Sequence, residues 1–246
     1  MDVLVVGAGE MGRWFADAVT ADVAFADADP ARAAAAADAL GARGSAVPLD
    51  GDDSFGVVCL AVPMRVTPDA IAEHAGKAQQ AVVDVSGVMG PPLSAMASAA
   101  PSRERVSFHP LFGADAAPGT VAVSTGADGP ATDRLERDLI DAGNDLVDVT
   151  PAEHDEAMRT VQGRTHAAVI AFALAASEGD PVPDDLTTPV YDRLESLAER
   201  VLSGTPRVYA DIQATFDGAD DVADAAERIA ETDPDGFEEL YDDARR

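Results

Sequence analysis

The stretch that decides the fold stands at the start of the chain, where residues 3–12 read Val3-Leu4-Val5-Val6-Gly7-Ala8-Gly9-Glu10-Met11-Gly12. The four apolar residues predict a strand that is buried on both faces. The G-x-G-x-x-G pattern then opens a predicted helix over residues 11–20, and a strand, turn and helix of this kind bind the pyrophosphate of a dinucleotide. Gly7 allows the tight turn, Gly9 lets the backbone approach the phosphates, and Gly12 permits close packing of the helix on the strand. The candidate cofactor-binding residues of the turn are Gly7, Ala8, Gly9, Glu10, Met11 and Gly12.

The sequence also has an acidic residue where such a fold needs one to bind the adenosine ribose. Residues 23–26 predict the second strand, and Asp27 follows Gly7 by 20 residues. A carboxylate there accepts hydrogen bonds from the ribose hydroxyls and repels the 2′-phosphate of NADP, so the sequence favours NAD as the cofactor. Asp29 is a rival for this role, and Arg32 is a residue type that accommodates a phosphate.

Short apolar runs alternate with helical stretches through the first 150 residues. Further strands are expected at residues 57–62, 81–85, 106–108, 120–124 and 146–149, and an alanine-rich helix at residues 30–40. This alternation predicts an α/β fold with a parallel, doubly wound sheet of the Rossmann type. Ala61, Val62 and Pro63 end one of these strands, at the edge that lines the nicotinamide side of the crevice in such folds.

The pattern becomes helical after Thr150. Helices are expected at residues 151–177, 189–202, 208–216, 220–231 and 234–245. The sequence therefore predicts two domains: an NAD-binding Rossmann domain over residues 1–150 and an all-α domain for substrate binding and dimerisation over residues 151–246. Because so small a helical segment buries little core by itself, we expect it to pack against a second copy in a homodimer.

The chain is strongly acidic. It has 45 Asp and Glu residues against 17 Lys and Arg residues, and its net charge is −28. Molar salt shortens the Debye length to about 3 Å and screens the resulting repulsion. We therefore interpret the composition as adaptation to high internal salt. The same charge argues against nucleic acids and anionic membranes as partners.

Nothing in the sequence indicates export. The first residues have no basic segment before an apolar stretch, and no apolar run approaches the length of a membrane-spanning helix. Cys59, the single cysteine, lies in an apolar run and is expected to be a buried, unreactive thiol. We expect a cytoplasmic protein.

Two polar residues stand where strands end. His109 follows the predicted strand at residues 106–108, and Ser86 follows the one at residues 81–85. The carboxyl edge of a doubly wound sheet is where ligands bind, so both are candidate catalytic residues. The four histidines have no metal-ligand spacing, so no metal is predicted, and the absence of G-x-S-x-G argues against a serine hydrolase. His74 lies in a polar helical stretch and is expected at the surface.

Three segments stand out together: His109-Pro110-Leu111-Phe112-Gly113, Asp84-Val85-Ser86, and His154-Asp155 followed by Gln162-Gly163-Arg164-Thr165-His166. They resemble, in order and approximate spacing over roughly residues 1–175, segments of the prephenate dehydrogenase family. With its acidic composition, the chain resembles a haloarchaeal-like member of that family. One departure is that Arg164 stands where the family usually has leucine, and Thr165 where some members carry a substrate-binding arginine.

The resemblance implies NAD-dependent oxidative decarboxylation of prephenate to 4-hydroxyphenylpyruvate, in tyrosine biosynthesis. His109 would take or polarise the proton of the ring hydroxyl, with an imidazole pKa near neutrality, and Ser86 would bind the same hydroxyl or orient the histidine. Gln162 and His166, with Arg164 or an arginine of a partner subunit, would meet the substrate carboxylates. His154, Met158, Gln162 and His166 are spaced by four residues and are expected to form one polar stripe that lines a cleft between the domains.

Three alternatives remain open. Arogenate dehydrogenase performs the same chemistry on a substrate with an amino group in its side chain. Another two-domain hydroxyacid reductase is a broader rival, although those sites commonly use a lysine in the helical domain and this chain has none there. A non-enzyme alternative is an NAD-binding dimerisation module.

The charge yields the first prediction. Transfer from molar KCl to dilute buffer should lower the melting temperature by on the order of 10 °C, because the acidic surface then repels itself without screening. Activity should fall in parallel. Thermal unfolding followed by circular dichroism across a KCl series measures the effect, and an equal melting temperature at both ends of the series would contradict the interpretation.

Overall fold

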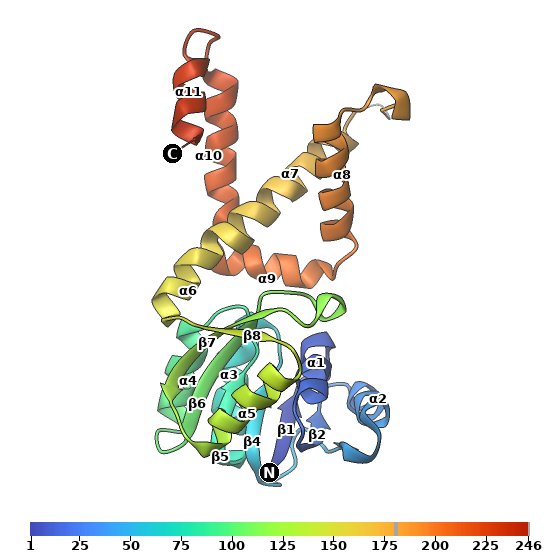
Figure 1. The fold of residues 1–246 in the computed structure, drawn as a ribbon, viewed down its shortest axis with the longest axis vertical. Helices are drawn as coiled ribbons and strands as arrows, with labels where there is room; N and C mark the ends of the chain where they lie inside the picture. Colours follow the sequence, from blue (N-terminus) through green and yellow to red (C-terminus); the bar gives the residue numbers. More distant parts are fainter. Residues whose placement is uncertain (180–181, 246) are drawn as a thin grey trace. The chain divides into compact units, whose positions relative to one another are not determined.

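The computed structural model describes residues 1–179 and 182–245, and the chain divides into two compact units, Met1–Asp155 and Glu156–Arg246. From the sequence, we predict that alternating strands and helices give way to helices alone at residue 150. Figure 1 shows that the strands belong to the first unit and that the second consists of helices. Each unit is described by itself.

One mixed sheet with helices on both faces forms the first unit. Its strands are β1 (Asp2–Val6), β2 (Asp22–Ala26), β3 (Gly44–Ala46), β4 (Phe55–Leu60), β5 (Ala78–Asp84), β6 (Glu104–Pro110), β7 (Thr120–Ala127) and β8 (Asp145–Asp148). Its main helices are α1 (Glu10–Ala18), α2 (Pro30–Leu40), α3 (Thr67–His74), α4 (Gly90–Ala99) and α5 (Pro130–Asp141). The Rossmann-type architecture expected from the alternating pattern is confirmed.

The strand order is β3-β2-β1-β4-β5-β6-β7-β8, and every neighbouring pair is parallel except β6 and β7. The sequence predicted a wholly parallel sheet and missed the short strand β3. The reason for the antiparallel pair is length. Residues 111–119 alone connect β6 to β7. A parallel crossover needs about a dozen residues or more, so the chain returns in the opposite direction.

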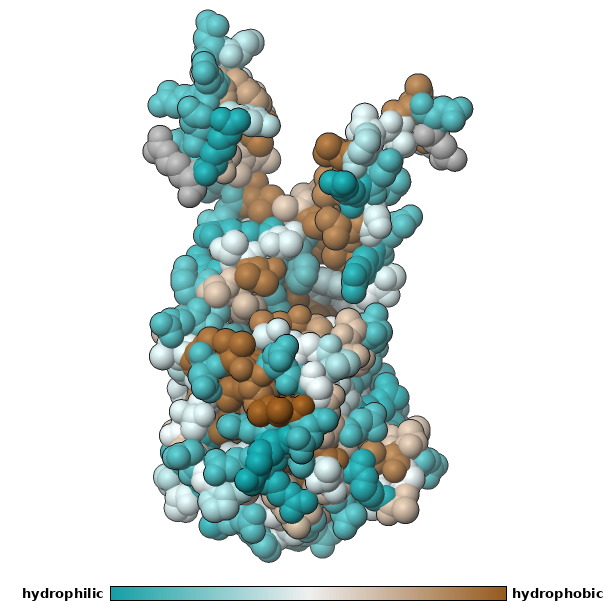
Figure 2. All heavy atoms as spheres, viewed as in Figure 1, coloured by the Kyte–Doolittle hydropathy of each residue, from teal (hydrophilic) through white to brown (hydrophobic). Residues whose placement is uncertain are grey.

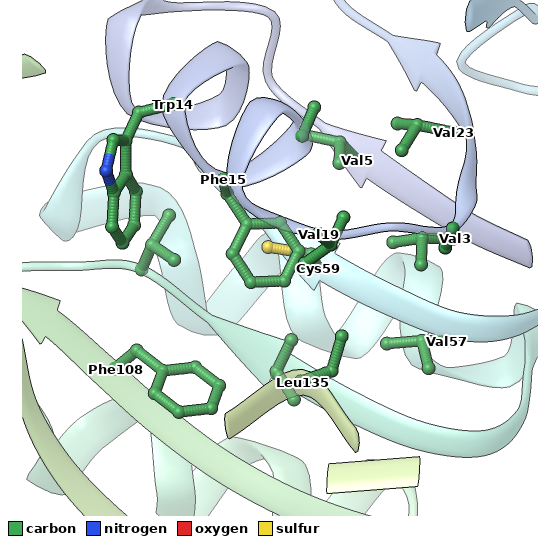
Figure 3. Packing of buried hydrophobic residues seen from close by; sticks show 14 of the residues in the cluster. Val3, Val5, Trp14, Phe15, Val19, Val23, Val57, Cys59, Phe108 and Leu135 are labelled. Carbon is green, nitrogen blue, oxygen red and sulfur yellow. The ribbon is translucent and has the colours of Figure 1, made fainter. Parts of the chain in front are cut away.

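Two apolar clusters hold the sheet between its helices. One packs α1, α2 and α5 on one face, and the other packs α3 and α4 on the opposite face. Figure 3 shows Phe15 of α1, Cys59 of β4 and Leu135 of α5 among the side chains that fill the first cluster. Cys59 is fully buried, and burial raises the pKa of its thiol, as expected for an unreactive core cysteine.

The expected surface position of His74 is wrong, because its side chain is only 3% exposed. Thr67, Ile71 and His74 are the buried residues of α3. Their spacing of four and three places them on one face of the helix, and that face covers the sheet. Burial lowers the pKa of His74.

The second unit is built from the helices α7 (Thr165–Ser177), α8 (Pro189–Leu202), α9 (Pro206–Phe216), α10 (Gly218–Glu231) and α11 (Phe237–Ala244). The long helix predicted over residues 151–177 is present as α6 (Pro151–Met158), a π-helical turn η5 (Arg159–Arg164) and α7. The predicted helix is thus interrupted by a π-helical turn between His154 and His166. The polar stripe expected from His154 to His166 stays a prediction.

A close approach of backbones explains where the π-helical turn lies. A Cβ atom on Gly218 would collide with the backbone of Gly163 and Arg164. Gln213 of α9 donates a hydrogen bond of 2.9 Å to the carbonyl oxygen of Gly163. α9 and the start of α10 thus pack on the π-helical turn, and Gln213 provides a hydrogen-bond donor for one of its carbonyl groups.

Within the described residues, no helix has the length and apolar character needed to cross a membrane. In the same part of the chain, no three His, Cys, Asp or Glu side chains are grouped so that they could hold a metal ion.

The three glycines of the turn after β1 have different structural roles. Gly7 has a φ angle of 101°, and a Cβ atom there would collide with the carbonyl oxygen of Ala61. A Cβ atom on Gly12 would collide with the carbonyl oxygen of Gly7. At Gly9 a Cβ atom would have no neighbour within 4 Å, and the backbone is extended with φ −73°. The fold therefore requires glycine at positions 7 and 12, whereas the open side of Gly9 leaves room for a ligand.

This difference predicts opposite outcomes for two substitutions. Gly9→Ala should leave the melting temperature within about 2 °C and weaken dinucleotide binding about 10-fold or more, because the added methyl group occupies the space of the pyrophosphate. Gly12→Ala should destabilise the fold by about 1–3 kcal/mol. Calorimetric NAD titration and thermal unfolding measure both. Unchanged NAD affinity in folded Gly9→Ala would show that no dinucleotide lies on this turn.

Candidate active site

The carboxyl ends of four adjacent parallel strands bring the candidate residues of the first unit to one edge. β1, β4, β5 and β6 are neighbours in that order, and they are followed by Gly7, Ala61 and Ser86, while His109 is the penultimate residue of β6. Asp84 pairs with Ser107, so Ser86 and His109 both lie two residues beyond a paired position. Sequence segments more than 100 residues apart thus meet at this edge.

The glycine turn is anchored to the end of β2. Asp27 accepts a 2.8 Å hydrogen bond from the backbone N–H of Ala8 through Oδ2 and another of 2.8 Å from the N–H of Asp29 through Oδ1. α1 begins at Glu10 without a side-chain cap, so its first N–H groups are available to a phosphate. The turn and the acidic residue are therefore held together before any cofactor binds.

The two residues that compete with Asp27 have other partners. Asp29 caps α2 by accepting a 3.0 Å hydrogen bond from the N–H of Ala31. Arg32 lies 3.9 Å from the Asp29 carboxylate, and both side chains are largely exposed. The neighbouring acid thus partly offsets the positive charge that would favour a 2′-phosphate.

Met11, Ala61 and Val62 are half-buried near the turn, whereas Glu10 and Pro63 are exposed. The N–H of Ala61 donates a 2.8 Å hydrogen bond to the carbonyl oxygen of Val6, which continues the sheet ladder past the end of β4. Ala61 therefore stands directly beside the glycine turn.

His109 is one end of a chain of hydrogen-bonded polar side chains. Its side chain is 5% exposed, and its Nδ1 lies 2.7 Å from Nε2 of His154, which is 3% exposed. The two rings meet edge to face at 78°. Nδ1 of His154 lies 2.8 Å from Oδ1 of Asp155.

Asp155 is fixed by the start of α4. Its carboxylate accepts hydrogen bonds from the N–H of Met89, at 2.9 Å, and from the N–H of Gly90, at 3.0 Å. A carboxylate at a helix N-terminus is favourably placed against the helix dipole. The chain from His109 through His154 to Asp155 therefore ends on a rigid anchor.

Burial sets the charge state of these groups. Burial lowers the pKa of His109 to about 3, and the neighbouring His154 lowers it further, whereas Asp155 acts in the opposite direction. The sequence predicted a pKa near neutrality, and the structure corrects this: His109 is a neutral imidazole at ordinary pH. Partial burial alone would raise the pKa of Asp155. The hydrogen bonds that it accepts from His154, Met89 and Gly90 together lower the pKa by more than burial raises it, so the carboxyl is ionised.

Ser86 is buried beside a second acid. Its hydroxyl donates a 2.8 Å hydrogen bond to the carbonyl oxygen of Val88, so it presents an accepting oxygen to a ligand. Its N–H donates a 3.0 Å hydrogen bond to Oδ2 of Asp84. Complete burial raises the pKa of Asp84 to about 7. Asp84 thus fixes the backbone that carries Ser86.

The remaining candidates belong to the second unit. Nε of Arg164 lies 2.7 Å from Oδ2 of Asp221, and Nη1 donates a 2.8 Å hydrogen bond to Thr160. His166 meets the ring of Tyr209 edge to face at 5.1 Å, and burial lowers its pKa. Gln162 is half-buried in the π-helical turn. Their roles as substrate ligands stay predictions, and the Arg164 guanidinium already has an acidic partner.

The sequence reasoning missed the contact between His109 and the His154–Asp155 pair. The two segments are 45 residues apart, and His154 was assigned to a stripe that continues into the second unit. The adjacency of an acid and a histidine was the available clue, because a carboxylate next to an imidazole commonly fixes its tautomer.

Comparison with known proteins agrees with this geometry. Residues 17–126 match the family model described as prephenate dehydrogenase, nucleotide-binding domain. A 4-amino-4-deoxyprephenate dehydrogenase of Streptomyces pristinaespiralis is 33% identical over 233 residues, covering 88% of this chain and 78% of the relative. The T-protein of Enterobacter agglomerans is 30% identical over 165 residues, covering 64% of this chain and 44% of the relative.

A solved structure shows the same fold. The prephenate dehydrogenase of Aquifex aeolicus, in complex with hydroxyphenyl propionate and NAD+, superposes with a TM-score of 0.74 at 19% identity, over 100% of this chain and 95% of that one. Because the Streptomyces relative exceeds 30% identity over most of both sequences, the chain belongs to the prephenate dehydrogenase family and is an oxidoreductase.

Proposed function

We propose that this protein catalyses the NAD-dependent oxidative decarboxylation of prephenate to 4-hydroxyphenylpyruvate, in tyrosine biosynthesis. The observation that carries the proposal is His109. It is a buried, neutral imidazole at the carboxyl edge of a dinucleotide-binding sheet, and its ring is held by His154. An accepting nitrogen at this edge suits a hydroxyl that must lose its proton as a hydride leaves the same carbon.

The residues at the glycine turn fit NAD. Gly9 has open space beside its backbone, the N–H groups of the first turn of α1 have no side-chain cap, and Asp27 stands at the end of β2. These features bind a pyrophosphate and a ribose with free hydroxyls. When bound, NAD supplies the acceptor for the hydride from C4 of the substrate ring.

His109 acts on the hydroxyl at C4. Since its pKa is held at about 3, it accepts a hydrogen bond from the hydroxyl and polarises it without storing a proton in the ground state. Electron density moves toward C4 as the hydride departs. When carbon dioxide leaves, the electron pair of the broken C–C bond enters the ring and restores aromaticity, and the hydroxyl hydrogen ends on the phenol oxygen of the product. The protein therefore has little more to supply than orientation. Ser86 contributes an accepting oxygen beside His109 or orients the ring.

The substrate's two carboxylates need positive or hydrogen-bonding partners, and the second unit offers Gln162, Arg164 and His166. Arg164 could serve there only by exchanging part of its contact with Asp221. In this assignment residues 1–150 bind NAD, and residues 151–246 bind the substrate carboxylates and form the dimer.

A second substrate has a specific observation in its favour. The Streptomyces relative acts on 4-amino-4-deoxyprephenate, as its name states. An amine at C4 offers N–H groups to the same accepting nitrogen, and its neutral form has the lone pair that helps the hydride to leave C4. Arogenate, which differs from prephenate in the side chain, is a third candidate substrate.

The helices of the second unit support a homodimer. Several large apolar side chains on them are more than half exposed, and Figure 2 shows brown apolar surface along the α8 and α10 segments. They are Leu174, Val190, Leu197, Leu202, Val208, Ile229 and Tyr241. Exposed apolar side chains of this kind mark an interaction surface, and we propose that a second copy of the chain covers them.

The function is tested by offering prephenate, arogenate and 4-amino-4-deoxyprephenate in parallel with NAD in molar KCl, and by following NADH absorbance. The highest kcat/KM should belong to prephenate. His109→Asn should lower turnover about 100-fold or more while NAD still binds, because the accepting nitrogen is lost. Normal turnover in that variant would remove His109 from the chemistry, and the highest kcat/KM with the amino analogue would favour the second substrate.

The dimer is tested by light scattering on a sizing column in molar KCl. The mass should be twice the 25.3 kDa of one chain. Leu174→Asp, on α7 of the second unit, should shift the mass toward the monomer, whereas Ile140→Asp, which is also more than half exposed and lies on α5 of the first unit, should not. A wild-type mass of one chain would refute the dimer.

A further inference from the structure

The directions of the hydrogen bonds that join His109, His154 and Asp155 decide which nitrogen of His109 carries its proton. An ionised carboxylate only accepts, so the hydrogen in the 2.8 Å contact with Asp155 belongs to Nδ1 of His154. Where His154 is a neutral imidazole, which has one donating and one accepting nitrogen, its Nε2 accepts. The hydrogen in the 2.7 Å contact therefore belongs to Nδ1 of His109.

We propose that His154 and Asp155 are positioning residues that hold His109 in its Nδ1-protonated tautomer, so that Nε2 is the nitrogen that accepts the substrate's hydroxyl hydrogen. The identity of that hydroxyl rests on the proposed function. The tautomer is a property of the protein alone, and it can be observed without any substrate.

The arrangement leaves His109 little freedom. Water cannot replace His154 as its partner, because both rings are nearly inaccessible, at 5% and 3% exposure. Asp155 cannot turn away without breaking its contacts with the N–H groups of Met89 and Gly90. A buried ring nitrogen left without a hydrogen-bond partner is strongly unfavourable. A neutral histidine side chain in water prefers the Nε2-protonated form, so the protein must impose the other one.

The opposite arrangement has a different outcome for the chemistry. If His154 were an imidazolium, its Nε2 would donate to Nδ1 of His109, and the proton of His109 would lie on Nε2. That nitrogen would then donate to the substrate hydroxyl and could not accept its proton. The two arrangements are therefore distinguishable by the ring nitrogens of a single residue.

The direct test is nitrogen-15 NMR of histidine-labelled protein at pH 8 in molar KCl, without substrate. The chain has only four histidines, so substituting each in turn assigns the ring signals. The proposal expects a protonated Nδ1 and an unprotonated Nε2 for His109, and a protonated Nδ1 for His154. A protonated Nε2 on His109 overturns it.

Variants test whether the two residues impose the tautomer. His154→Phe keeps a planar ring and removes the accepting nitrogen, and Asp155→Asn keeps the shape and removes the charge. Both should move the His109 signals toward the Nε2-protonated form and lower kcat about 10- to 100-fold, with KM for NAD within about twofold. Glu156→Gln, at the exposed neighbouring carboxylate, should change neither. Unchanged His109 signals in both folded variants overturn the proposal, and if neither variant folds, the wild-type spectrum decides.

The tautomer of His109 and the proposed function are tested by different measurements. An Nδ1-protonated His109 in a protein that turns over none of the three substrates supports the tautomer assignment and removes the proposed function. Turnover of prephenate with a His109 protonated on Nε2 keeps the function and overturns the role of His154 and Asp155.

Discussion

Parallel pairing of β1, β4, β5 and β6 is the constraint on which the site depends. Because these strands run in one direction, their carboxyl ends meet at the same edge, and whatever follows each strand becomes part of one site. The pairing of the strands brings the glycine turn, Ala61, Ser86 and His109 to this edge. The chemistry of the site is then decided by the few residues that occupy those positions.

Polar groups at this edge are stable because they are paired. His109, His154 and Ser86 are all less than 6% exposed, and an unmade hydrogen bond at such a position destabilises the fold by about 1–3 kcal/mol. The anchor of the chain, Asp155, is bound by two backbone N–H groups of the first unit. The same contacts that satisfy buried polar atoms therefore also orient the imidazole of His109.

Much of this architecture could be predicted from the sequence, and the errors have physical causes. Continuous apolar runs and the glycine pattern were sufficient for the strands of the nucleotide-binding unit, because buried parallel strands and tight turns need those residue types. The antiparallel β7 depends on the length of a connection, which periodicity does not reveal. His74 was misplaced because polar neighbours hid its helical spacing from Thr67 and Ile71. The contact of His109 with His154 was not predictable, since it joins a strand end to a helix 45 residues later.

The most direct test of the central claim uses prephenate that carries deuterium at C4 of the ring. The account holds that the hydride leaves that carbon while His109 accepts the hydroxyl hydrogen. It predicts that deuterium is found on the nicotinamide of the reduced cofactor, with stoichiometric release of carbon dioxide. Deuterium that is retained in the aromatic product or lost to water while NADH forms would contradict hydride transfer from C4, and with it the role assigned to the buried histidine.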